Sequence, residues 1–341
     1  MDLKKGMVLK EDIYSLTGVL LLKKGTILKD DHMHYLSRHR IQIKEHDQPK
    51  DLIGKKIGEL NEVVYRSVYS SVQELQTSIS GKSKLDDNEI QEMVDTFQEL
   101  HEEFALKDIG ILELMERFSE DEYLFKHSIN VGLIASKIGR ILKLSEKHQQ
   151  FLASMGLFHD VGKFKIDPMI LNKPSRLTDE EFNLIKQHPE LGFDLLSKTS
   201  LHPLILEGVL KHHERLNGTG YPNRLNGDSI PFFIRILSVA DTFDAICSNR
   251  VYRSSMSIFY AVDELIKEVK QNRLDEAIVL PFTNFLMELV KGKKITLRNG
   301  KVGEILHIDF QYPNQPILKI DGFQPLNLQK ENLTLNQVAN M

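Results

Sequence analysis

Residues 120–290 are patterned as consecutive α-helices that are separated only by short polar breaks. One helix start is marked directly, because Thr178 and Glu181 in TDEE have the spacing of a capping box ahead of the apolar stretch FNLIKQHPELGFDLL. A block of this kind buries its apolar faces by packing helix against helix. The sequence therefore predicts a mainly α fold with a helical bundle at its centre.

A second helical region precedes this block. Apolar residues recur there at steps of three and four, which describes one apolar helix face; its members are Ile57, Leu60, Val64, Val68, Val72, Leu75 and Ile79. A second stripe follows the polar break GKSKLDD and consists of Ile90, Met93, Val94, Phe97 and Leu100. The two stripes predict either a helical hairpin or an arm, over helices 57–104, through which two copies of the chain form a homodimer. The pattern alone does not choose between them.

Both flanks of the chain carry short strand signals. GVLLLKKGTIL places Gly18 and Gly25 around a short apolar run, which predicts a hairpin. Near the other end, ITLRNGKVGEILHIDF places Asn299-Gly300 between alternating apolar positions, which is typical of a β-hairpin. We therefore expect four parts: a small β-rich segment at residues 1–50, a helical linker or regulatory helices at 51–118, the central helical domain at 119–290 and a β-rich segment at 291–341.

Charge and cysteine content argue against several classes of protein. Lys+Arg 44 against Asp+Glu 48 leaves a formal net charge of -4, so no global basic field points to duplex nucleic acid or an anionic membrane. The single cysteine, Cys247, excludes an intramolecular disulfide and fits a reducing compartment. No signal peptide follows MDLKKGMVLK, and the run from Val19 to Leu22 is too short to span a bilayer. We expect a cytoplasmic protein without a membrane span.

Histidines and aspartates recur at the expected ends of separate helices in the central block. They are His127, His159, Asp160, His188, His212, His213 and Asp241. A bundle lets such side chains project inward and meet, and a His/Asp ligand set without thiolates suits iron or manganese rather than a closed structural zinc site. Because there are more ligands than one ion needs, we predict two divalent metal ions bridged by Asp160. Two ions a few ångströms apart clamp a phosphoryl centre and supply hydroxide at neutral pH.

Four stretches together resemble the HD-GYP family: HDVGKFKI, QHPELG, HHERLNGTGYP and SVADTFDAICSNRVYR. This family comprises bacterial members of the HD metal-dependent phosphohydrolase superfamily that hydrolyse cyclic di-GMP. The stretches occur in the family's order and cover roughly residues 120 to 285. The resemblance implies that residues 119–290 are an HD-GYP catalytic domain with an HD-type helical bundle, and that the chain is a cyclic di-GMP phosphodiesterase.

The resemblance also implies roles for individual residues. The metal ligands would be the seven histidines and aspartates named above, and Asp160 and Lys163 would be the catalytic residues. Lys163 would face the scissile phosphate, since its position four residues after His159 places both on one face of a helix. It would neutralise charge or help to protonate the leaving oxygen. A hydroxide activated by the two metal ions would attack phosphorus and yield pGpG, GMP or both.

Substrate contacts follow from the same resemblance. The glycines of GTGYP would let the loop backbone pass close to the site, and Tyr221 would stack on guanine or donate its hydroxyl to the phosphate. Arg250 and Arg253, in SNRVYR, match the family's phosphate-binding positions, where a planar guanidinium makes bidentate contacts with a diester.

Two positions depart from the family pattern. One branch of the family has a glutamate four residues before the first histidine that helps to bind a third metal, but this chain has Tyr123 there. We therefore expect two metal ions and slow conversion of pGpG to GMP. Arg224 stands where many relatives carry glycine.

Two other functions remain open. One is a degenerate module that binds cyclic di-GMP without turnover, which the intact ligand set disfavours. The other is an HD hydrolase for another nucleotide, which the GTGYP loop and the two arginines disfavour.

Overall fold

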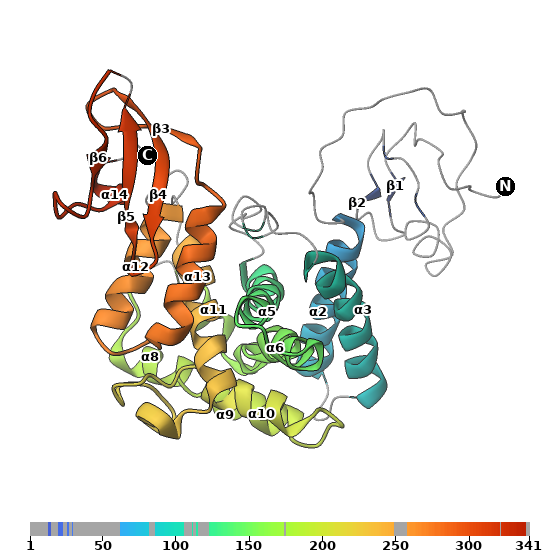
Figure 1. The fold of residues 1–341 in the computed structure, drawn as a ribbon. Coiled ribbons are helices and arrows are strands. Elements are labelled where there is room, and N and C mark those ends of the chain that lie inside the picture. The colour runs from blue at the N-terminus through green and yellow to red at the C-terminus, as the bar shows by residue number, and fades with distance from the viewer. Residues whose placement is uncertain are drawn as a thin grey trace, which may run out of the picture.

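The computed structural model describes residues 13–14, 20–22, 26, 29, 62–81, 86–105, 111, 114, 123–173, 175–248, 258–320 and 322–338. Within these residues the fold is mainly α with a small antiparallel sheet near the C-terminus, which confirms the predicted fold class (Figure 1). Arg250, Arg253 and most of the N-terminal segment lie outside the described residues. None of the helices described is long and apolar enough to cross a membrane.

The centre of the fold is a bundle of helices around α5. The bundle helices are α5 (Tyr123–Ile141), α6 (Glu146–Phe158), α9 (His188–Leu196), α10 (Pro203–Lys211), α11 (Phe232–Ser248), α12 (Ile258–Lys270) and α13 (Glu276–Glu288). The short elements between them are η2 (Val161–Lys165), α7 (Pro168–Leu171), α8 (Asp179–Ile185) and η3 (Gly227–Ser229). Helix α5 packs along α6 and α11, while α10 packs against α6 and α9. The bundle thus brings helices from distant parts of the chain to one centre.

The helix start predicted at Thr178 is present, but the helix is shorter than the apolar stretch suggested. Thr178 Oγ1 accepts a hydrogen bond from the Glu181 amide at 3.2 Å, and the Glu181 carboxylate accepts one from the Thr178 amide at 2.8 Å. Helix α8 ends at Ile185, and α9 begins at His188 with Pro189 in its first turn. Proline has no amide hydrogen with which to continue the preceding helix, so the stretch divides into two helices. The division places His188 at a buried helix start.

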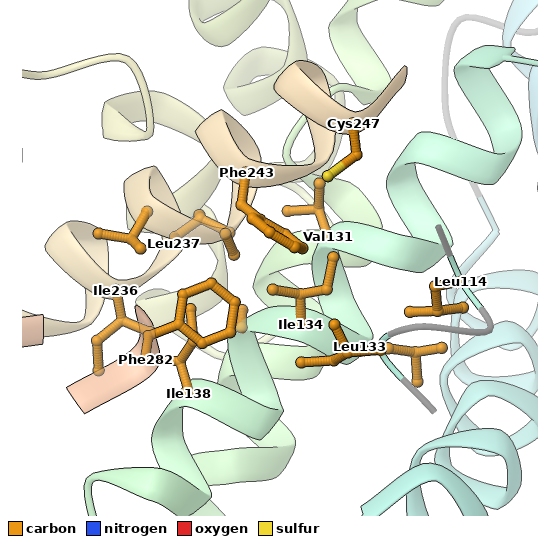
Figure 2. Close-up of a cluster of buried hydrophobic side chains, with 14 of the residues drawn as sticks. Leu114, Val131, Leu133, Ile134, Ile138, Ile236, Leu237, Phe243, Cys247 and Phe282 are labelled. Carbon is orange, nitrogen blue, oxygen red and sulfur yellow. The ribbon is translucent and has the colours of Figure 1, made fainter. Parts of the chain in front are cut away.

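The apolar core lies between α5, α11 and α13. Phe243 of α11 and Phe282 of α13 pack edge to face, with ring centroids 5.1 Å apart. Figure 2 shows these rings beside Val131, Ile134 and Ile138 of α5, and all five side chains are buried. An aromatic pair of this geometry contributes about 0.5–1.5 kcal/mol beyond its buried area. The core therefore holds α11 on α5, and both helices carry predicted metal ligands.

The two apolar stripes upstream of the bundle form a helical hairpin. It consists of α2 (Glu62–Gly81) and α3 (Asp87–Ala105), which pack on each other and on α5 and α6 (Figure 1). The described members of the stripes are buried or half-buried within the chain. Since these faces already have partners in the same chain, a homodimer through these helices would have to use their other faces. The homodimer stays a prediction.

The C-terminal strands form a sheet that packs on the bundle. Strands β3 (Lys294–Thr296), β4 (Val302–Asp309), β5 (Tyr312–Ile320) and β6 (Leu326–Asn327) pair antiparallel in sequence order, with α14 (Leu335–Val338) beside them. The predicted turn at Asn299-Gly300 lies between β3 and β4, and Gly300 has a φ of 81°. Asp263 of α12 ties the sheet to the bundle, because its carboxylate accepts hydrogen bonds from Asn314 and Thr334.

The N-terminal strand signal is also borne out in part. Leu20–Leu22 (β2) pairs antiparallel with Ile13–Tyr14 (β1), so the apolar run does belong to a strand pair.

Candidate metal centre

The fold brings all the predicted metal ligands together. His127 comes from α5, His159 and Asp160 follow α6, His188 begins α9, His212 and His213 follow α10, and Asp241 comes from α11. All are buried except His213, whose side chain is 18% exposed. The expectation that all of them occupy helix ends was wrong for Asp241, which lies in the middle of α11, and for His127, which lies in the second turn of α5.

One group of ligand atoms surrounds Asp160 Oδ2. This oxygen lies 3.4 Å from His127 Nε2 and 3.3 Å from His159 Nε2, and the two nitrogens are 3.2 Å apart. Asp241 Oδ1 lies 3.2 Å from His127 Nε2. Two imidazoles and two carboxylates thus converge on one point.

A second group surrounds the other oxygen of the same carboxylate. Asp160 Oδ1 lies 3.2 Å from His188 Nε2 and 3.7 Å from His212 Nε2, and these nitrogens are 3.1 Å apart. His213 also offers a nitrogen within reach of this group. Its Nδ1 lies 3.8 Å from Asp241 Oδ2. Each oxygen of Asp160 therefore faces a different set of histidines.

These separations fit two cations. Metal–ligand bonds of about 2.0–2.2 Å place neighbouring ligand atoms of one ion about 3.0–3.5 Å apart. The closest contacts in both groups have this spacing. In addition, Asp160 Oδ1 is buried and accepts no hydrogen bond of normal geometry from the described residues. A buried carboxylate oxygen without a partner is costly, so its environment suits a positive ion between it and the imidazoles.

The second nitrogen of three of these histidines is held by the backbone. In each case Nδ1 bonds the carbonyl oxygen three residues earlier: His159 to Gly156 at 2.6 Å, His188 to Ile185 at 2.8 Å and His212 to Val209 at 2.9 Å. Because a carbonyl only accepts, Nδ1 carries the proton and Nε2 presents a lone pair to the centre. This is the tautomer that a metal ligand needs.

His127 is oriented differently, by a carboxylate that sequence reasoning missed. Its Nδ1 lies 2.7 Å from Asp244 Oδ2, and Asp244 Oδ1 accepts a hydrogen bond from Asn130 Nδ2 at 3.0 Å. Asp244 is buried and lies one helical turn after Asp241 in SVADTFDA. Its position three residues from a predicted ligand, on the same helix face, was the available signal.

The carboxylates of the centre are held in their anionic form. Burial opposes ionisation of Asp160, but the adjacent His159 and the Lys163 ammonium hold its pKa well below the usual value. The pKa of Asp241 is lowered in the same way, against burial, first by its hydrogen bond with His127. The centre therefore carries two negative charges with little exposure to water.

The pKa values of the histidines are shifted in different directions by their surroundings. Burial lowers the pKa of His212 to about 4 and also lowers the pKa of His213, so both are neutral near pH 7. Burial disfavours the charged form of His127 too, but its hydrogen bonds with Asp241 and Asp244 outweigh burial and raise its pKa to about 10. A cation bound at His127 would therefore release a proton.

Lys163 lies at the centre, although not for the reason expected. Helix α6 ends at Phe158, and Lys163 belongs to the 3₁₀ turn η2, so His159 and Lys163 do not share a face of one α-helix. The tighter turn instead directs Lys163 Nζ to Asp160 Oδ2, at 2.6 Å. Lys163 also lines the cavity beside the centre.

Two glycines allow backbone to approach the ligands closely. A Cβ on Gly162 would lie 1.9 Å from the His188 carbonyl oxygen, and one on Gly220 would lie 2.4 Å from the His213 carbonyl oxygen. Any side chain at either position would push a ligand-bearing segment away. The GTGYP loop therefore passes directly against the backbone from His213 to Arg215, as the interpretation of its glycines expected.

Glu214, the third residue of HHE, is a second residue whose role the sequence did not reveal. It is buried, and its two carboxylate oxygens accept hydrogen bonds from the backbone amides of Asn223 at 2.7 Å and Leu225 at 2.8 Å. Glu214 thus links the backbone just after the GTGYP loop to the segment that carries His212 and His213. Arg224, between these two amides, has a φ of 55°, the left-handed region in which glycine is least strained.

Tyr221 faces the centre from this loop. Its ring lies 4.6 Å from the His213 ring, centroid to centroid, with a 31° angle between the planes. Burial and the charges of Asp160 and Asp241 raise its pKa, so the phenol keeps its proton and is able to donate it. Tyr221 is one wall of a cavity of about 600 Å³. The remaining walls are His127, Lys163, His213, Arg215, Thr219, Gly220, Asp241, Thr242, Ala245, Ile246, Glu268 and Arg273.

Some predicted residues are not placed. Arg250 and Arg253 lie outside the described residues, and Tyr123 begins α5 with a side chain that is also outside them. Arg215 and Arg273, which line the cavity, were not anticipated. Arg215 lies within HHERLNGTGYP but was given no role there, and Arg273 lies outside the motifs and gave no sequence signal.

Known proteins match the part of the chain that forms this centre. Residues 113–278 match the family model described as HD domain. Cyclic di-GMP phosphodiesterase PA4108 of Pseudomonas aeruginosa is 32% identical over 198 residues, which are 58% of this chain and 47% of that protein. The 3'3'-cGAMP-specific phosphodiesterase 1 of Vibrio cholerae is 33% identical over 160 residues, 47% of this chain and 37% of that protein.

A solved structure shares the fold. Bd1817, described as an HDG"Y"P protein from Bdellovibrio bacteriovorus, aligns with a TM-score of 0.59 at 16% identity and covers 84% of this chain and 97% of that one. The chain spans about half the length of the first curated relatives it matches. The family model and the curated relatives thus support the resemblance over residues 113–278, and the solved structure shows a shared fold.

Proposed function

We propose that the protein is a cyclic di-GMP phosphodiesterase, because residues 113–278 match the family model described as HD domain and several curated relatives are named as enzymes of this activity. The observation that carries the proposal is the division of Asp160 between two groups of histidines, one at each oxygen. This arrangement supports two divalent ions, iron or manganese, held by the seven predicted ligands. When bound, such a pair polarises a phosphodiester and lowers the pKa of water.

The residues around the ligands would perform the remaining tasks. Lys163 lies on Asp160 Oδ2, the oxygen that faces His127 and His159. A cation at that oxygen would compete for it, which would free the ammonium to bind the scissile phosphate and to protonate the leaving oxygen. Tyr221 keeps its hydroxyl proton and would donate it to a phosphate oxygen, while the ring face turned away from His213 would stack on a base. We propose that Arg250 and Arg253 add further phosphate contacts.

The test is metal analysis of anaerobically purified protein followed by a turnover assay with cyclic di-GMP in which pGpG and GMP are resolved. We expect two ions per chain, since Tyr123 stands where a third-metal carboxylate would be, and pGpG as the accumulating product. Tyr123→Glu, four residues before His127 on α5, should add a ligand on that face and raise both metal content and GMP yield. Three tightly bound ions in the unmodified protein would overturn this interpretation of Tyr123.

The far end of the cavity holds an arginine–glutamate pair that can contact a base. The cavity follows α11 from Asp241 to Ile246, about 7.5 Å at 1.5 Å per residue, and reaches Glu268 and Arg273. Arg273 donates from one guanidinium nitrogen to Glu268 Oε1 at 3.1 Å. The pair presents donors next to an acceptor. Guanine presents two adjacent donors, N1–H and N2–H, to a carboxylate and the O6 acceptor to a guanidinium, whereas adenine presents a carboxylate with only one donor, N6–H, beside the N1 acceptor. This pattern favours guanine.

Glu268→Gln is therefore expected to change substrate preference. An amide offers one acceptor and one donor, which matches the adenine edge better than a carboxylate does. The ratio of kcat/KM for cyclic di-GMP over 3'3'-cGAMP should fall by about tenfold. The matched control is Glu264→Gln, one turn earlier on α12, whose carboxylate pairs with Lys267 and does not line the cavity. Equal ratios in both variants would remove Glu268 from base recognition.

A second candidate is an enzyme for another cyclic dinucleotide, favoured by the similarity to the 3'3'-cGAMP-specific relative. The same assay separates the two, because a preference for 3'3'-cGAMP in the unmodified protein would favour this candidate. Binding of cyclic di-GMP without any turnover by the metal-loaded protein would instead indicate a signalling module. We also propose that the chain divides into four segments, at residues 1–50, 51–118, 119–290 and 291–341. Cyclic di-GMP is the proposed partner, and the cytoplasm is the proposed location of the protein.

A further inference from the structure

A line of buried hydrogen bonds connects helix α2 to the metal centre. Tyr65 of α2 donates its hydroxyl proton to Asn130 Oδ1 at 3.2 Å. The Asn130 amide donates to Asp244 Oδ1 at 3.0 Å, and Asp244 Oδ2 lies 2.7 Å from His127 Nδ1. Tyr65, Asn130, Asp244 and His127 are each at most 4% exposed. Helix α2 lies outside residues 113–278, so this connection begins beyond the HD domain.

Each bond in this line fixes the orientation of the next group. The Tyr65 hydroxyl donates to the oxygen of the Asn130 side chain, which leaves the Asn130 NH₂ group pointing at Asp244. Asp244 then has one oxygen occupied, and the other accepts the proton of His127 Nδ1. When a metal ion displaces the second proton of His127, this bond keeps the remaining proton on Nδ1 and leaves the Nε2 lone pair directed toward Asp160 and Asp241. Without the hydroxyl, the Asn130 amide is free to turn.

A second contact joins the other end of α2 to the same centre. Lys165 Nζ donates to the Ile79 carbonyl oxygen at 2.8 Å, and Lys165 lies at the end of η2, the turn that follows Asp160. Tyr65 and Ile79 are fourteen residues apart, about 21 Å along the helix. Helix α2 is thus tied to the segments that carry His127 and Asp160, at two separate points.

We propose that Tyr65 is a positioning residue through which helix α2 sets the orientation of the ligand His127. A displacement of α2 would break the Tyr65–Asn130 hydrogen bond and weaken metal binding in the group formed by His127, His159, Asp160 and Asp241. The group formed by His188, His212 and His213 has backbone partners instead and would keep its affinity. The inference rests on the proposed metal centre, and it makes α2 a route by which a change outside residues 113–278 reaches that centre.

The experiment is titration of the metal-free full-length chain with Mn²⁺, with free Mn²⁺ followed by electron paramagnetic resonance. Tyr65→Phe keeps the ring and removes only the hydroxyl, so we expect one of two Mn²⁺ affinities to fall by about two- to tenfold. The substrate KM should stay unchanged, while the Mn²⁺ concentration for half-maximal turnover rises. Tyr69→Phe is the matched control, because Tyr69 is one turn later on α2 and its hydroxyl accepts from Gln73 at the surface.

The route is tested with a double variant. Tyr65→Phe should add no further loss to Asn130→Ala if Tyr65 acts through Asn130. Unchanged Mn²⁺ affinity in Tyr65→Phe, equal losses at both sites, or fully additive losses with Asn130→Ala would each overturn the role of Tyr65. Failure of the unmodified protein to bind Mn²⁺ would overturn the metal centre itself, and with it this role. The two failures are therefore distinguishable.

Discussion

Asp160→Asn is expected to remove bound metal and turnover together, each by at least about 100-fold, since loss of an outer-shell partner of a ligand already costs 10- to 100-fold. The side chain keeps its volume but exchanges one oxygen for an amide nitrogen. In the native protein Oδ2 faces His127 and His159, and Oδ1 faces His188 and His212. Whichever way the amide turns, one group of histidines faces an NH₂ donor. The measurements are elemental analysis and cyclic di-GMP hydrolysis on the same preparation.

The matched control for this change is Asp263→Asn. Asp263 is also buried, and both its oxygens accept hydrogen bonds, from Asn314 and Thr334, but it joins α12 to the C-terminal sheet. We expect this variant to lower the free energy of unfolding without lowering metal content. If Asp160→Asn retained full metal and full rate, the two-metal assignment would be wrong.

Asp244→Asn is the second large expected effect, with metal affinity lowered about 10- to 100-fold. Both oxygens of Asp244 accept hydrogen bonds, one from Asn130 and one from His127. An asparagine has a single acceptor, so one of these bonds becomes a contact between two donors. Asn130 cannot turn to relieve it without losing the bond from Tyr65. The variant also loses the negative charge that makes His127 a stronger ligand.

This prediction is checked by Mn²⁺ titration alongside the Asp263→Asn control. The loss should be confined to one of the two affinities, because His188 and His212 are oriented by backbone carbonyls that the substitution does not touch. Circular dichroism would establish that the helices remain. Native affinity at both sites would show that Asp244 has no part in orienting His127.

Local patterns were sufficient to predict most of the helices. Apolar residues at steps of three and four reflect burial of one helix face, so the stripes of α2 and α3 were visible, and so was the capping box at Thr178. The division between α8 and α9 was not anticipated, since the apolar stretch runs through it. The expected α-helical relation between His159 and Lys163 was wrong because the chain tightens to a 3₁₀ turn after α6.

The sequence alone established a mainly α chain that carries an HD-type set of histidines and aspartates, because residue type and helical spacing are local properties. Tertiary packing decided which carboxylate oxygen faces which histidine, and it brought Asp244 to His127 across 117 residues of chain. It also decided that α2 reaches the centre through Tyr65 and Asn130. Such pairings depend on how whole helices cross one another, and that geometry results from the sum of many apolar contacts rather than from any one stretch of residues.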